Sequence, residues 1–274
     1  MRFMAVAVFL AMLACAAFAQ EKQAARPEVG KPVQAAQLLL NQKKYKDALA
    51  QLRQADAVPN KSPYETYVIA ATRAAVDLAA GETGDAIKAL EAVLATGMLP
   101  PPEALLRVQA LAQLDYQVKD YPNAIGYAAR YYRAGGTDPT LRLLMAQAYY
   151  LEGNYAEAAK TLHVVTEDEE RSGKPASENV LLMLLSSEAQ LKDEAGRLAT
   201  LEKLVALYPK KEYWTDLLAA VQRRPGFAGR LALDVARLKA ATGVLASEAD
   251  YMDAAQHGQT RGPEPRTRFT LRGA

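Results

Sequence analysis

Side chains that commonly ligate metals or act as nucleophiles are scarce in this sequence of 274 residues. It contains two histidines, His163 and His257, and one cysteine, Cys15. A zinc site usually draws three or four ligands from histidine, cysteine and carboxylate side chains. Two distant histidines and one cysteine do not make such a set, so the sequence predicts neither a metal site nor a cofactor. His163 stands between Leu162 and Val164, as expected for a helix residue at a core edge or on the surface.

Motifs of catalysis and phosphate binding are also missing from the sequence. It has no G-x-S-x-G nucleophile elbow, no Walker loop and no H-E-x-x-H pair. The segment GETG at 81–84 is not followed by the basic residue of a phosphate-binding loop, so we interpret it as a turn. The acidic run EDEE at 167–170 lacks the alternating ligands and glycine of a calcium loop. We therefore expect that the protein is not an enzyme.

The composition indicates a helical globular protein. Half of the residues are hydrophobic and 23% are charged, which is enough for a sizeable core. Alanine and leucine dominate while β-branched runs are scarce, and this favours helices. The formal net charge is +2, so no broad positive field points to a nucleic-acid partner.

Pairs of small residues recur along the chain with a separation of twelve residues. A short turn, such as AGETG or EGNY, lies between the members of each pair. Small side chains let two antiparallel helices approach closely, and larger residues fill the space around them. The pattern therefore predicts a series of helix–turn–helix hairpins. The pairs are Ala36 with Ala48, Ala74 with Ala86, Ala112 with Ala124, Ala146 with Ala158, and Ser187 with Ala199.

Other positions keep the same register relative to the second small residue of each pair, and we expect them to fill the space around it. Three residues before it stand Tyr45, Thr83, Tyr121, Tyr155 and Gly196. Four residues after it stand Leu52, Leu90, Ala128, Leu162 and Lys203. Seven residues after it stand Ala55, Val93, Tyr131, Val165 and Ala206.

The segment MAQAYYLEGNYAEAAKTL at 145–162 shows the pattern most fully, and it resembles the tetratricopeptide repeat, which has a period of 34 residues. The resemblance covers roughly residues 29–210 and extends more weakly to about 242. The second small residues are 38, 38, 34 and 41 positions apart, and the surplus falls in Pro-, Gly- and charge-rich loops. Ala176 lies in one such loop and is expected to tolerate a larger side chain. The resemblance implies an all-α fold, a right-handed α-solenoid of five to six stacked antiparallel helix hairpins.

The same resemblance implies a binding face, because the first helices of tetratricopeptide hairpins line a concave groove. Gln and Tyr recur there without strong charge; Gln both donates and accepts hydrogen bonds, and Tyr adds a flat apolar ring with a polar tip. The Lys, Arg and Asn set with which the family's best-known groove holds a terminal carboxylate is absent. Contacts on the convex face remain the alternative. The candidate binding residues are Gln37, Gln109, Gln113, Tyr116, Gln147, Tyr150 and Glu188.

The N-terminus has the features of a secretory signal. Arg2 precedes an apolar run, and Ala17-Phe18-Ala19 forms a small-x-small site that predicts cleavage before Gln20. We therefore expect a cleavable signal peptide at 1–19 and a periplasmic protein with no integral membrane span in the mature chain. A lipid anchor through Cys15 and an uncleaved anchor helix are the alternatives.

The far end begins a sixth hairpin. Trp214 and Leu217 match the W-x-x-L of the repeat, and helices are expected at 211–222 and 227–241 around a Pro225-Gly226 turn. Trp214 is interpreted as a core anchor between hairpins. A further helix is expected at 251–256. The final segment 257–274 has no periodicity and is predicted to be a disordered tail. The C-terminal sequence is either natural or the result of a truncation or frameshift.

These segments imply four regions: the signal at 1–19, a linker at 20–28, a helical repeat domain at 29–256 and the tail. The far end resembles exported tetratricopeptide proteins associated with TonB-type energy transduction. That resemblance implies a non-catalytic periplasmic scaffold or adaptor that binds a peptide or protein segment of the cell envelope in its groove. The alternative is an envelope-enzyme regulator or a module that binds glycan or peptidoglycan, because Gln and Tyr also suit sugars.

Overall fold

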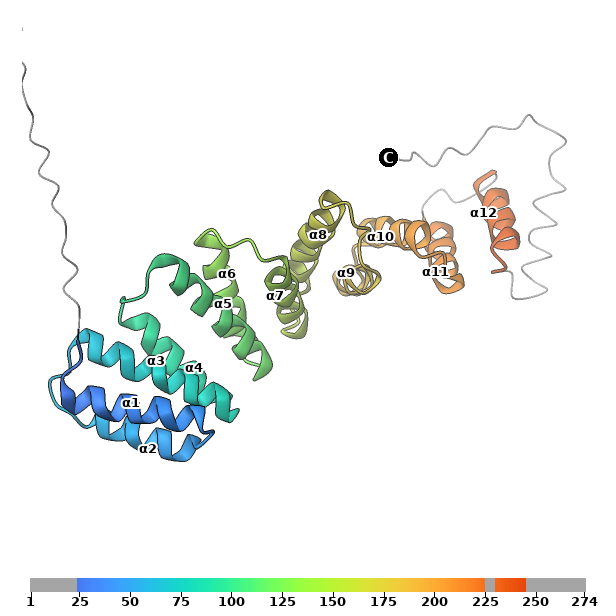
Figure 1. Ribbon diagram of the computed structural model, residues 1–274. Coiled ribbons are helices and arrows are strands. Elements are labelled where there is room, and N and C mark those ends of the chain that lie inside the picture. The colour runs from blue at the N-terminus through green and yellow to red at the C-terminus, as the bar shows by residue number, and fades with distance from the viewer. Residues whose placement is uncertain (1–23, 225–229, 245–274) are drawn as a thin grey trace, which may run out of the picture. The chain divides into compact units, whose positions relative to one another are not determined.

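The computed structural model describes residues 24–224 and 230–244, and within them every regular element is an α-helix (Figure 1). The helices form consecutive antiparallel pairs, so the predicted all-α solenoid of stacked hairpins is confirmed. The first three pairs are α1 (Pro27–Asn41) with α2 (Tyr45–Asp56), α3 (Pro63–Ala80) with α4 (Thr83–Ala95), and α5 (Pro101–Gln117) with α6 (Tyr121–Arg133). The next three are α7 (Pro139–Leu151) with α8 (Tyr155–Arg171), α9 (Glu178–Leu191) with α10 (Glu194–Leu207), and α11 (Lys211–Gln222) with α12 (Arg230–Ala241).

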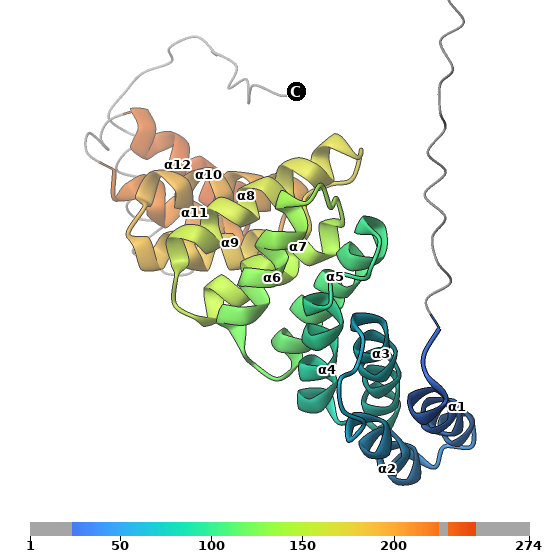
Figure 2. The same cartoon turned by 90° about the vertical axis from the view of Figure 1, so that its left-hand side faces the viewer.

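The chain divides into two compact units, Met1–Pro100 and Pro101–Ala274. The first unit holds α1–α4 and the second holds α5–α12. Both views of the ribbon show, inside each unit, helices that follow one another in the order of the sequence (Figures 1 and 2). This arrangement is what stacked hairpins require, because each hairpin covers the apolar face of its neighbour.

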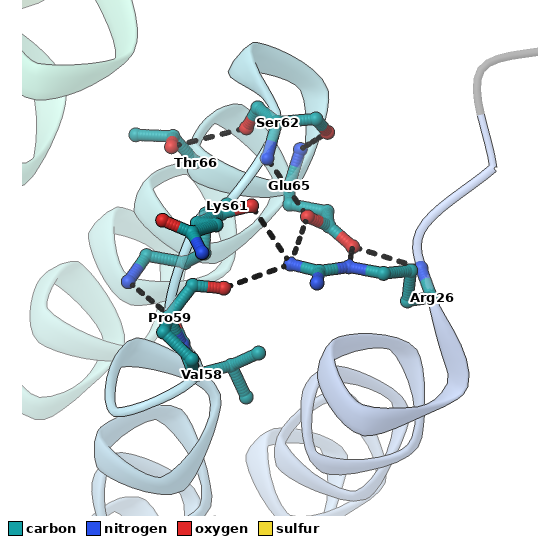
Figure 3. A network of polar contacts seen from close by, with 8 residues as sticks. Arg26, Val58, Pro59, Lys61, Ser62, Glu65 and Thr66 are labelled. Carbon is teal, nitrogen blue, oxygen red and sulfur yellow. Dashed lines mark hydrogen bonds and ion pairs between the residues drawn. The ribbon is translucent and has the colours of Figure 1, made fainter.

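A polar clamp fixes the start of α1 to the start of α3 in the first unit. Ser62 and Glu65 form a reciprocal capping box at the N-terminus of α3. The Glu65 carboxylate also accepts bonds from the backbone N–H and the guanidinium of Arg26, the N-cap residue of α1 (Figure 3). The clamp therefore joins the first two hairpins through side chains of residues 39 positions apart.

Each of the first five hairpins turns through one residue in the left-handed region of the backbone. Such a conformation suits glycine and is uncommon for other residues, so its recurrence marks equivalent positions. The next residue is the N-cap of the second helix, and in three hairpins its side chain accepts a bond from the N–H three residues on (Asp120, Asn154 and Asp193). The left-handed residues are Lys43, Gly81, Lys119, Gly153 and Lys192, with φ between 57° and 79°.

The left-handed residues provide a common reference for numbering the hairpins. With this reference, the predicted pairs of small residues are correct in four hairpins. The second alanine lies five residues after the left-handed residue each time, and it is fully buried. Its partner in the first helix is buried as well. These residues are Ala36, Ala48, Ala74, Ala86, Ala112, Ala124, Ala146 and Ala158, all between 0% and 3% exposed.

The predicted register of the fifth hairpin is wrong by two residues. Five positions after Lys192 stands Arg197, not Ala199. Accordingly Lys203 is exposed, as is Ala206, whereas Leu201 and Leu204, each two residues earlier, are fully buried. The error arose because this hairpin has larger residues where the others have alanine, while Ser187 and Ala199 satisfied the spacing elsewhere.

Ala176 also differs from its expectation. It lies in the connection between α8 and α9, as predicted, yet it is fully buried and packs in a core cluster with Leu181, Leu201 and Leu204. Tyr208 donates a hydrogen bond from its hydroxyl to the Ala176 carbonyl over 2.9 Å. This connection is therefore part of the core and has no room for a larger side chain.

The far end agrees with the sequence where it is described. Helix α11 has the predicted bounds, and the half-buried Trp214 packs against the α9–α11 core and against Leu218, Val235 and Val244. It is therefore the predicted core anchor. The predicted signal peptide, the Pro225-Gly226 turn, the helix at 251–256 and the tail lie outside the described residues.

Candidate functional site

The predicted binding residues of the second unit lie on neighbouring first helices. Tyr116 on α5 donates a hydrogen bond from its hydroxyl to Gln147 Oε1 on α7, over 3.3 Å. The hydroxyl of Tyr150 on α7 is 2.8 Å from that of Ser186 on α9. Each tyrosine stands four residues after the buried small residue of its own hairpin, so tyrosines at equivalent positions bond to the next hairpin twice. The stacking therefore brings the Tyr and Gln rows together.

A second tyrosine supports each ring from within its own hairpin. The rings of Tyr116 and Tyr121 have centroids 5.6 Å apart, and those of Tyr150 and Tyr155 are 5.4 Å apart. Tyr121 and Tyr155 are the first residues of α6 and α8. Burial, with a smaller contribution from Tyr121, raises the pKa of Tyr116 further above its usual value, and its hydroxyl acts as a hydrogen-bond donor.

The glutamines differ in how far they are engaged. Gln109 Nε2 donates to Asp138 Oδ2 over 2.5 Å, and Asp138 is the N-cap residue of α7. Gln113 is exposed and Gln147 is half-buried. We call the set Gln109, Gln113, Tyr116, Gln147, Tyr150 and Ser186 the polar face.

Two predicted residues do not belong to the polar face. Gln37 lies in the first unit, where its Nε2 is 3.5 Å from the hydroxyl of Thr72. Glu188 was expected on an open surface, but it is 1% exposed. It was chosen because the predicted register of this hairpin was two residues too late. Ser186, which sequence reasoning missed, occupies the equivalent position in α9. The left-handed Lys192 is the structural feature that reveals this shift.

Glu188 lies between α9 and α10 in an enclosed polar environment. Its Oε1 accepts a bond from Thr200 Oγ1 over 3.0 Å, and Nε2 of the exposed His163 is 3.7 Å away. Burial raises the pKa of Glu188 to about 6; Thr200 lowers it, Asp193 raises it and Arg197 lowers it. This carboxyl group is thus part of the packing inside the hairpin.

In residues 24–224 and 230–244 we find no cluster of three histidine, cysteine or carboxylate side chains suited to a metal ion. Across the same residues, no helix combines the length and the apolar character that a membrane crossing would require.

One family model and several solved structures resemble parts of this chain. A family model described as anaphase-promoting complex, cyclosome, subunit 3, matches residues 117–176. Among curated proteins, none matches the chain. Similar solved structures include MamA AMB-1, at 15% identity over 66% of this chain and 99% of that one, with a TM-score of 0.45. YrrB, a TPR protein with an unusual peptide-binding site, has 18% identity over 66% of this chain and 87% of its own, with a TM-score of 0.44.

A tetratricopeptide repeat protein from Parabacteroides merdae has 15% identity over 85% of both chains, with a TM-score of 0.38. The family-model match, 117–176, spans α6, α7, α8 and most of the connection from α8 to α9, including the left-handed turns at Lys119 and Gly153. The helices before and after it form hairpins of the same kind. Helix hairpins therefore continue on both sides of the segment that the family model matches.

Proposed function

We propose that this protein is a non-catalytic scaffold that binds an extended segment of a partner protein on the polar face of its second unit. We further propose that it acts in the periplasm after export, as an adaptor in a TonB-type envelope complex. The repeat type supports the scaffold, since tetratricopeptide folds are in general interaction modules. The secretory features of the N-terminal sequence support the location.

The observation that carries the proposal is the repeated tyrosine bond between hairpins. Tyr116 with Gln147, and Tyr150 with Ser186, set a tyrosine hydroxyl against a polar side chain of the next first helix at two successive steps. An extended peptide also repeats its backbone groups at regular steps. A partner segment can therefore meet equivalent surroundings from α5 to α9.

The surroundings of the polar face suit a peptide because they offer both polar and apolar contacts. The exposed Gln113 offers a donor and an acceptor to backbone groups. Leu106 lies three residues before Gln109, and Leu182 lies four residues before Ser186, so helical spacing places both near this face. They are 59% and 36% exposed, and they can cover apolar side chains of the partner.

The test begins with a pull-down from envelope extract and measures the affinity of the recovered partner by calorimetry. The double variant Tyr116→Ala, Tyr150→Ala should lower affinity at least about tenfold, which is about 1.4 kcal/mol. The double variant to Phe keeps the rings and removes the hydroxyls, so it separates stacking from hydrogen bonding. Leu207→Ala, an exposed residue of α10, is the control and should leave affinity unchanged.

A loss of less than about threefold in the alanine variant, with helicity retained, would show that the partner binds elsewhere. Recovery of glycan rather than protein by the polar face would favour the envelope-glycan module. Location is tested separately by mass spectrometry of the exported chain. A mature N-terminus at Gln20 is expected, and a lipid on Cys15 would overturn the free periplasmic form.

A further inference from the structure

A pocket of about 720 Å³ lies between the start of α7 and the end of α8 in the second unit. The connection before α7 and the connection after α8 complete its wall. Three cationic side chains line it, Arg142, Arg171 and Lys174, together with two carboxylates, Asp168 and Glu169. The lining therefore carries an excess of one positive charge.

Both carboxylates of the lining are already engaged by donors of the protein. Asp168 accepts a bond from Arg142 Nη1 at Oδ2, over 2.9 Å, and one from Arg171 Nη1 at Oδ1, over 2.6 Å. The two oxygens of Glu169 accept from the backbone N–H and the hydroxyl of Ser177. Each carboxylate oxygen of the lining thus has a donor within the protein.

The cations, in contrast, keep donors that the protein does not use. Lys174 is exposed, and within residues 24–224 and 230–244 its ammonium group has no hydrogen bond or ion pair. Arg171 bonds to Asp168 through Nη1 alone, and a guanidinium group has five N–H donors, so most of them remain available. The pocket therefore offers donors in excess of acceptors, which is what an anion requires.

Arg142 gives this pocket a charge that is fixed in place. Its guanidinium carbon lies 4.7 Å from the centroid of the Tyr132 ring, and its side chain is 27% exposed. The aromatic contact and the bond to Asp168 together hold the guanidinium plane. A group that is already ordered loses little conformational entropy when a ligand binds beside it.

We propose that this pocket binds a carboxylate group, the chemistry of a glutamate side chain of a polypeptide or of a small free acid. The carboxylate lies at Lys174 and Arg171. The methylene groups of the ligand lie against the apolar part of the lining, Pro139, Leu143 and Val165. The proposal is independent of partner binding on the polar face.

A phosphate group fits this lining less well. It carries about two negative charges at neutral pH, whereas the lining has an excess of only one positive charge. The second charge would lie close to Asp168 and Glu169 without a cation of its own. A carboxylate brings one negative charge and two oxygens, which can accept from an ammonium and a guanidinium group together.

The experiment titrates the full chain with two probes at low salt and follows its proton–nitrogen NMR spectrum. The probes are butyrate and an acetylated, amidated Gly-Glu-Gly peptide; butyramide and the glutamine analogue of the peptide are the uncharged controls and should not bind. The double variant Arg171→Gln, Lys174→Gln should weaken probe binding at least about tenfold. Both residues are exposed, so the fold should persist. The double variant Lys211→Gln, Arg223→Gln is the matched control, because it removes the same charge from exposed residues outside this pocket.

A further variant, Thr137→Phe, tests where the probes bind. Thr137 is exposed and lines the pocket from the connection before α7, so the larger ring should block entry while the helices persist. Binding of both probes supports the proposal for either source of the carboxylate. Binding of the peptide alone points to a polypeptide side chain, and binding of butyrate alone points to a small acid.

Three results would overturn the proposal. The first is that neither probe binds. The second is that the charge-matched control weakens binding as much as the double variant of the pocket, since the effect would then come from net charge alone. The third is that the pocket variant and Thr137→Phe both bind the probes as the unmodified chain does.

Discussion

Arg26 and Glu65 hold the first two hairpins together through three hydrogen bonds. The Arg26 backbone N–H and Nε donate to Glu65 Oε1 over 2.9 and 2.8 Å, and Nη2 donates to Oε2 over 2.9 Å. The same Nη2 also donates to the carbonyls of Pro59 and Asn60 before α3 (Figure 3). Arg26 thus contacts both the loop and the helix start of the second hairpin, although it lies within the predicted linker.

This clamp predicts acid sensitivity of the first unit. The Arg26 side chain, followed by the backbone N–H groups of Ser62 and Arg26, lowers the pKa of Glu65 from 4.5 to about 2. Because the folded-state pKa is the lower one, the contribution of Glu65 to stability is fully present above pH 4.5 and is lost as the pH falls toward 2.

Glu65→Gln should therefore lower the melting temperature at pH 7, and this effect should shrink as the pH falls from 4.5 to 2. Asp56→Asn, which removes the exposed partner of Arg73, is the control and should matter less at pH 7. A loss from Glu65→Gln that stays constant with pH would contradict the clamp.

Close packing of the fourth hairpin predicts that Ala158→Leu overpacks it. Ala158 is fully buried, and the change should cost about 1–3 kcal/mol, measured by urea unfolding. Ala176→Leu should also destabilise, because that residue is fully buried despite its place in a connection. Ala156→Leu, on the exposed side of α8, is the control and should stay within about 0.5 kcal/mol. Equal effects at 156 and 158 would show that the helix faces are misassigned.

The sequence was sufficient for the repeat architecture because close helix contacts demand small side chains at a fixed spacing. That demand holds at Ala112 and Ala124 but is relaxed in the fifth hairpin, where Arg197 takes the alanine position. Spacing alone could not place that hairpin; the left-handed Lys192, which no residue type signals, sets its register. The Tyr and Gln rows were predictable for the same reason as the hairpins. The bond from Tyr150 to Ser186 was not, since it depends on the corrected register.

The corrected register makes a prediction that separates it from the original one. Leu201→Ala should cost about 2–5 kcal/mol, because it empties a fully buried site between α9, α10 and α11. Lys203→Ala should cost less than about 1 kcal/mol, since it removes only an exposed ion pair with Glu170. Urea unfolding of both variants measures the difference. A larger loss at 203 than at 201 would restore the original register.

The buried Glu188 predicts that its own contribution to stability falls as the pH rises through the range from 4.5 to 6. Burial raises its folded-state pKa to about 6, above the usual 4.5. Well below pH 4.5 the carboxyl group is protonated in both states and carries no penalty. Above pH 6 it is ionised in both, and the folded state bears the cost of holding that charge in the interior, about 1–2 kcal/mol.

Glu188→Gln removes the titration and keeps an oxygen that can accept from Thr200. Its stability relative to the unmodified chain should therefore improve by about 1–2 kcal/mol between pH 4 and pH 8, whatever its absolute value. Glu202→Gln, an exposed acid of α10, serves as the control and should show no such trend. Urea unfolding across this pH range gives the comparison. If the Glu188→Gln difference stays flat, the carboxyl group is not held away from water in the folded protein, and the packing between α9 and α10 would have to be looser than the structure shows.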